Sequence, residues 1–116
     1  MTLTSTRLLT KRADQLTEQA ELAAESAMET TEIGIARLKQ AEATHCVVQA
    51  DQVAQQAHDA ALTAIREGAR GGTLCSSKEE WAIYLYTARA AAETRLHLYV
   101  AGEAVQSLTD PNYSIV

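Results

Sequence analysis

The chain has 116 residues, of which 47% are hydrophobic, with one Pro, five Gly and no Phe. So few residues that break helices favour long helices and argue against a sheet. The net charge of −5 argues against a nucleic-acid backbone as partner. Charged residues interrupt every stretch of about 20 residues, so no transmembrane span or membrane partner is expected. Cys46 and Cys75 form neither a disulfide framework nor a zinc spacing, and no signal-peptide pattern precedes them, which predicts a cytoplasmic protein.

The first predicted helix covers residues 3–33. Its small and apolar residues recur at alternating steps of four and three, which is the heptad spacing of a packed helix face. This first seam consists of Leu9, Ala13, Leu16, Ala20, Ala23 and Ala27. Because Ala buries little area, we expect the core to depend on close approach of the helices.

The second predicted helix covers residues 35–67 and has a seam made almost entirely of Ala. This second seam begins at Val47 and consists of Val47, Ala50, Ala54, Ala57, Ala61 and Ala64. Between the two seams the heptad count fails, and we expect Met28, Ile35 and Leu38 to bridge the two registers.

Two arrangements fit the region around Gly34. In the first, Gly34 ends the first helix in a left-handed cap, and the chain turns back. In the second, one helix about 95 Å long continues through a stutter at Gly34. No capping residue follows Gly34, which counts against the break, but three helices of matched length suit a bundle, so we favour the first arrangement.

The third predicted helix covers residues 77–108, after a Gly-rich loop at residues 68–73. Ser76 and Ser77 each precede a Glu by three residues, the spacing of a capping box, and Pro111 ends the helix. Because this helix is apolar on nearly every side, we expect it to form the central wall of the fold. Residues 1–110 are then one helical domain, and residues 111–116 are a short tail.

The fold class predicted from these elements is all-α, an antiparallel bundle of three long helices with Ala-rich seams. The third helix carries more apolar surface than two Ala-lined helices can cover. We therefore expect the bundle to be completed by dimerisation through the third helix, which makes the protein a homo-oligomer.

Aromatic residues on the third helix are the first group of candidate binding residues. Trp and Tyr are enriched at the energetic centres of protein interfaces. The spacing places Trp81 and Tyr84 on one face and directs Tyr86 and Tyr99 elsewhere. Burial within the core of the bundle is the alternative for these four residues.

Acidic residues on the first helix are the second group. Six carboxylates recur at steps of four and three, and like charges at that spacing repel one another; they are Asp14, Glu18, Glu21, Glu25, Glu29 and Glu32. A solvated outer face is the simplest interpretation. A basic protein partner is the functional one, with Glu18, Glu21, Glu25 and Glu29 as contacts.

The function predicted from these features is a non-enzymatic protein-interaction module: a small adaptor, chaperone, immunity protein or inhibitor. The alternative is a metal-binding bundle similar to ferritin, because Glu42 and His45 have the Glu-x-x-His spacing of di-iron proteins. A second such pair is missing from the sequence. The prediction therefore includes no metal, no cofactor and no catalytic residues.

Overall fold

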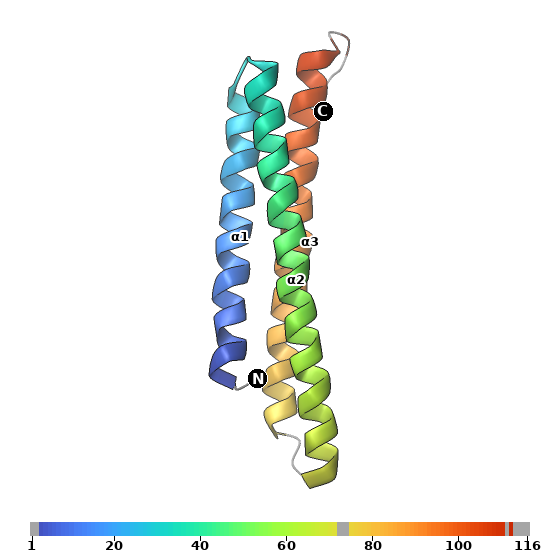
Figure 1. Ribbon diagram of the computed structural model, residues 1–116. Helices are drawn as coiled ribbons and strands as arrows, with labels where there is room; N and C mark the ends of the chain where they lie inside the picture. The colour runs from blue at the N-terminus through green and yellow to red at the C-terminus, as the bar shows by residue number, and fades with distance from the viewer. Residues whose placement is uncertain (1–2, 72–74, 111, 113–116) are drawn as a thin grey trace.

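The structure is a computed structural model that describes the backbone of residues 3–71, 75–110 and 112, with the side chains of residues 7–68, 78–110 and 112. It contains three helices, α1 (Leu3–Glu29), α2 (Ile33–Gly71) and α3 (Cys75–Thr109), and the described residues form no strand. Each helix packs against the other two in a rod 62 Å long (Figure 1). The prediction of an all-helical bundle of three helices is confirmed.

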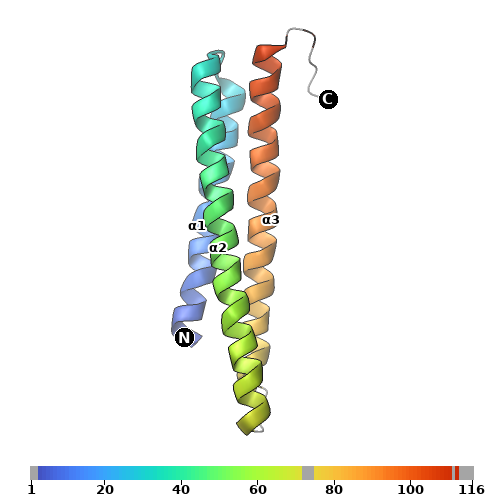
Figure 2. The same cartoon turned by 45° about the vertical axis from the view of Figure 1, so that its right-hand side comes forward.

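The helices alternate in direction, so that α1 and α3 run the same way and α2 runs opposite to both (Figures 1 and 2). Cross-helix contacts agree with this order, since Arg7 lies beside Glu79 and Asp14 beside Tyr86, whereas Arg95 lies beside Asp51. The α2–α3 pair extends beyond the start of α1 in Figure 1. The three helices are 27, 39 and 35 residues long, so they are not of matched length as the sequence predicted.

The chain reverses direction between α1 and α2 at residues 30–32, just before Gly34. Thr30 Oγ1 accepts a hydrogen bond from the backbone N–H of Glu32 at 3.1 Å, and the carbonyl of Glu32 accepts the N–H of Ala36 at 3.1 Å. This short turn, closed by the hydroxyl, replaces the glycine cap. The prediction that Gly34 is a left-handed cap is wrong, because Gly34 lies in the first turn of α2 without a positive φ. The continuous helix is excluded as well.

The connection between α2 and α3 is shorter than the predicted loop at residues 68–73. Helix α2 continues to Gly71, and α3 begins at Cys75, one residue before the first predicted cap. A glycine inside a helix costs only about 1 kcal/mol, so Gly68 does not end α2, which continues to Gly71. The capping side chains of Ser76 and Ser77 lie outside the described residues, as does the predicted tail apart from Asn112.

The core consists mainly of alanine, as the seams predict. All six residues of the first seam are buried. In α2 the buried set starts earlier than predicted, at Ala36, and includes Cys46 and Val53 in preference to Val47 and Ala54. The predicted bridging residues Met28, Ile35 and Leu38 are exposed instead, because the turn ends one seam and starts the other without any need for a bridge.

Helix α3 is not the central wall that its composition predicts. Its inner face holds Thr87 and Thr94, both fully buried, whose hydroxyls donate to the carbonyls of Tyr84 and Ala91 at 2.9 and 2.7 Å. Its outer face carries Leu85, Leu96 and Tyr99 in solvent. Two neighbouring helices can cover only part of a third, so much of the apolar surface of α3 stays uncovered.

Candidate protein-interaction surfaces

Trp81 and Tyr84 form an aromatic cluster with a residue of α2. Their ring centroids are 5.1 Å apart, which confirms that they share a face of α3. The ring of His58 packs edge-on against Tyr84 at 4.9 Å and lies 6.4 Å from Trp81. Tyr84 packs on the buried core, whereas Trp81 remains 38% exposed. His58 was not among the predicted residues.

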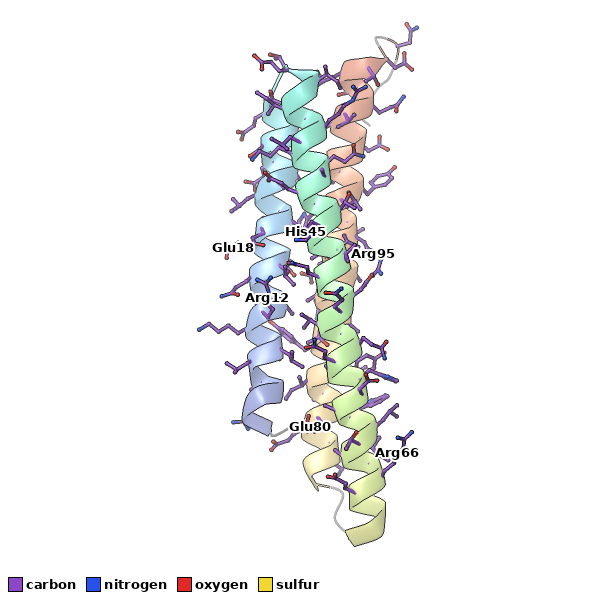
Figure 3. The ribbon with its side chains drawn as sticks, in the orientation of Figure 1. Arg12, Glu18, His45, Arg66, Glu80 and Arg95 are labelled. Atoms are coloured by element: carbon purple, nitrogen blue, oxygen red, sulfur yellow. The ribbon has the colours of Figure 1, made fainter. Side chains whose placement is uncertain are left out.

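A groove of about 350 Å³ follows the α2–α3 boundary beside this cluster, with His58 and Tyr84 in its lining. Arg95 also lines this groove and donates from Nη2 to Oδ1 and Oδ2 of Asp51 at 2.6 and 2.5 Å. Figure 3 places Arg95 and the acidic residue Glu18 on opposite sides of the bundle. The charge of Arg95 is therefore neutralised locally and does not balance the acidic residues of α1.

The acidic groove, as we name it, lies between α1 and α3. It has a volume of about 350 Å³ and is lined by Asp14, Thr17, Glu18, Glu21, Tyr86, Arg89, Ala90 and Glu93. Four of these side chains are carboxylates, and one, Arg89, is a cation whose Nε lies 3.5 Å from Glu93. The structure thus brings Glu18 and Glu21 together with Tyr86. Glu25 and Glu29 are exposed on α1 but do not line this groove.

Tyr86 is held at the wall of the acidic groove by Asp14. Its hydroxyl donates to Asp14 Oδ1 at 2.5 Å. This hydrogen bond, followed by partial burial and the charge of Asp14, raises the pKa of Tyr86. The phenol therefore stays neutral at physiological pH, where it can donate or accept a hydrogen bond but adds no further negative charge.

The outer face of α3 is the most apolar exposed feature of this helix. Leu85, Leu96 and Tyr99 are 54%, 66% and 67% exposed, all more than Trp81. A hydrogen bond to Glu103 raises the pKa of Tyr99, so this phenol is also neutral at physiological pH. Leu85 and Leu96 were not predicted as site residues. The sequence contained the signal, because Leu85, Ala92 and Tyr99 follow one another at steps of seven residues, and Leu96 lies between Ala92 and Tyr99.

Glu42 and His45, the residues of the alternative metal site, have other side chains as partners in the structure. Glu42 pairs with Lys39 at 3.3 Å, and His45 Nε2 lies 2.9 Å from Gln49 Nε2. The groove beside them receives Gln19, Leu22 and Ser26 from α1, none of which is a carboxylate. Among the side chains that the structure describes, no three His, Cys, Asp or Glu residues gather in a group that could hold a metal ion.

Cys46 lines the groove beside Glu42 and His45 and belongs to neither the aromatic cluster nor the acidic groove. Cys46 is buried, and its thiol lies 3.9 Å from Gln19 Oε1. Burial, and then the charge of Glu42, raises the pKa of Cys46, which keeps the thiol protonated and unreactive. The side chain of Cys75 lies outside the described part of the chain.

Comparison of the chain with protein-family models, with curated proteins and with solved structures finds no match. Within the described ranges, none of the helices has a stretch both long and apolar enough to cross a membrane.

Proposed function

We propose that the protein is a non-enzymatic protein-interaction module of the cytoplasm that binds a basic partner and associates with itself. The observation that carries the proposal is the acidic groove, where four carboxylates surround the neutral phenol of Tyr86 and face one cation, Arg89. A cluster of like charges is unfavourable without counterions. A basic protein surface would relieve this repulsion.

The shape of the acidic groove favours a helix as the bound segment. Helices α1 and α3 pack against each other and run in the same direction (Figure 2). A fourth helix laid between them would complete a four-helix bundle. Lys or Arg side chains of the partner would meet Glu18, Glu21 and Glu93. Charge would set orientation and association rate, and apolar burial would supply most of the affinity.

Trp81 and Tyr84 provide a second contact surface on the other side of α3. Trp81 is partly exposed while its ring is held by Tyr84 and His58. An aromatic ring held in this way loses little conformational entropy on binding, which is why such rings are effective anchors. In this proposal, the module acts by covering or scaffolding its partner rather than by chemistry.

The acidic groove is tested with a synthetic amphipathic helical peptide of Lys and Leu, measured by titration calorimetry. The double variant Glu18→Gln with Glu21→Gln is compared with Asp59→Asn with Glu67→Gln. Both pairs of side chains are exposed, and both variants change the net charge equally. We expect the groove variant to bind about tenfold more weakly and the control to bind like wild type.

The dependence of peptide affinity on salt concentration is an independent test of the same interaction. Screening shortens the range of exposed charges to about 8–10 Å at physiological ionic strength, so peptide affinity should fall as salt rises in wild type and less steeply in the groove variant. Equal weakening in the two double variants would mean that the peptide responds to net charge alone, and the acidic groove would not be a binding site.

A further inference from the structure

The outer face of α3 carries a continuous stripe at heptad spacing. Steps of four and three residues connect its members, which we call the α3 stripe: Leu85, Arg89, Ala92, Leu96, Tyr99 and Glu103. The sides of α3 next to this stripe are already occupied. Ala90 accepts a hydrogen bond from Thr17 of α1 at 3.4 Å, and Arg95 bonds Asp51 of α2. Apart from Arg89, which also lines the acidic groove, the stripe therefore lies away from both neighbouring helices.

The spacing of the α3 stripe is the spacing that two coiled helices use to pack against each other. Its large apolar members, Leu85, Leu96 and Tyr99, are each more than half exposed. Ala92 lies between them, and a small side chain there allows close approach of another helix. In a monomer these apolar side chains would remain in water. Burying them against another helix would be favourable.

The charges of the α3 stripe identify its occupant. Arg89 lies seven residues before Leu96, and Glu103 lies seven residues after it, so each is about 10 Å from Leu96 along the helix. A second copy placed antiparallel, with the two-fold axis at Leu96, brings each Arg89 opposite a Glu103. A parallel copy would bring Arg89 against Arg89 and Glu103 against Glu103, which is unfavourable.

We propose that the protein forms a two-fold symmetric homodimer in which the α3 stripes of two copies pack antiparallel around Leu96. This inference rests on the self-association in the proposed function and specifies its surface and geometry. It shares Arg89 with the acidic groove, so binding of a basic partner and dimerisation are separated with variants that leave Arg89 in place. A single helix pair is a small interface, so a dissociation constant on the order of micromolar is expected.

The first experiment is sedimentation velocity of the whole chain at concentrations from about 1 to 500 micromolar, a range chosen to span the expected affinity. Wild type is compared with Leu96→Lys on the stripe and with Leu38→Lys on α2. Leu38 is 60% exposed and Leu96 66%, so the two substitutions are matched, and circular dichroism verifies the fold. We expect a concentration-dependent dimer in wild type and Leu38→Lys, and a dimer weakened more than about tenfold in Leu96→Lys.

The second experiment tests the antiparallel geometry by exchanging charges. Arg89→Glu and Glu103→Arg are each expected to weaken the dimer, because each places like charges opposite one another. The double variant restores opposite charges and should recover wild-type association. If the helices paired in parallel, wild type, the two single variants and the double variant would all place like charges opposite one another, and the double variant would bring no recovery.

A wild-type chain that stays monomeric at the highest concentration would overturn the proposal. Equal behaviour of Leu96→Lys and Leu38→Lys would do so too, as would a double charge variant that fails to recover. The peptide titration of the acidic groove changes Glu18 and Glu21 of α1, which are not part of the α3 stripe. Failure of the dimer with retained peptide binding would therefore leave the partner-binding function intact, and the reverse result would leave the dimer intact.

Discussion

Glu80 is a carboxylate at a position that the fold assigns to its core. It lies seven residues before Thr87, fourteen before Thr94 and twenty-one before Ala101, all of which are buried. Glu80 itself is 6% exposed, and its Oε2 atom has no hydrogen-bond partner among the side chains that the structure describes. Figure 3 shows it near the lower end of α3. A buried, unpartnered oxygen of an ionised group costs free energy because it gives up hydration without replacement.

Replacing Glu80 by Gln should therefore stabilise the bundle by about 1 kcal/mol or more, because the charge is removed while the size of the side chain is kept. The adjacent Glu79→Gln is the control, since Glu79 is exposed and makes only a surface ion pair with Arg7 at 3.5 Å, worth little. Thermal unfolding of both variants measures the difference. A loss of stability in Glu80→Gln greater than that in the control would contradict this account.

At the scale of the element, the end of α1 depends on one hydroxyl. Thr30 Oγ1 accepts the N–H of Glu32, and the neighbouring Thr31 is exposed. The bond fixes the turn that reverses the chain and starts α2. The sequence shows two adjacent threonines there, and the structure distinguishes them.

The variant Thr30→Ala should lower the free energy of unfolding by about 0.5–1.5 kcal/mol, the usual contribution of one intramolecular hydrogen bond. Thr31→Ala changes the same residue type one position further on and should leave stability nearly unchanged. Urea denaturation followed by circular dichroism compares them. Equal losses in the two variants would show that the hydroxyl of Thr30 does not hold the turn.

At the scale of the whole molecule, an alanine core leaves few large side chains to stabilise the rod. Leu16 is the largest of the fully buried apolar residues and lies in a cluster with Leu9, Val53 and Ala57. Close approach of three backbones explains how small residues can bury each other fully. It also makes the core depend strongly on those few large side chains.

The variant Leu16→Ala should cost about 2–5 kcal/mol, because the surrounding helices cannot collapse fully into the space left by the side chain. Leu22 lies six residues further along α1 and is exposed, so Leu22→Ala should stay within about 0.5 kcal/mol of wild type. Chemical denaturation with matched slopes provides the comparison. Similar losses of unfolding free energy in Leu16→Ala and Leu22→Ala would show that the core does not depend on Leu16.

The positions of the binding residues were predictable only in part. Trp81 and Tyr84 share a face because three residues separate them on a helix, and the acidic residues of α1 are exposed for the same local reason. His58 and Glu93 joined these groups from elsewhere in the chain. Their positions depend on how far the helices slide along one another, and no spacing within a single helix contains that information.

The sequence by itself determined that the chain is helical and that the first Ala-rich seam is buried, and it favoured three helices without excluding one helix that continues through Gly34. These properties follow from residues near one another along the chain, through helix propensity and heptad spacing. Only the tertiary structure decided where α1 ends, which half of α3 remains in solvent, and that Asp14, Glu18, Glu21 and Glu93 line one groove. Those outcomes depend on which surfaces the other helices cover, and that competition between helices is settled only when all three are packed.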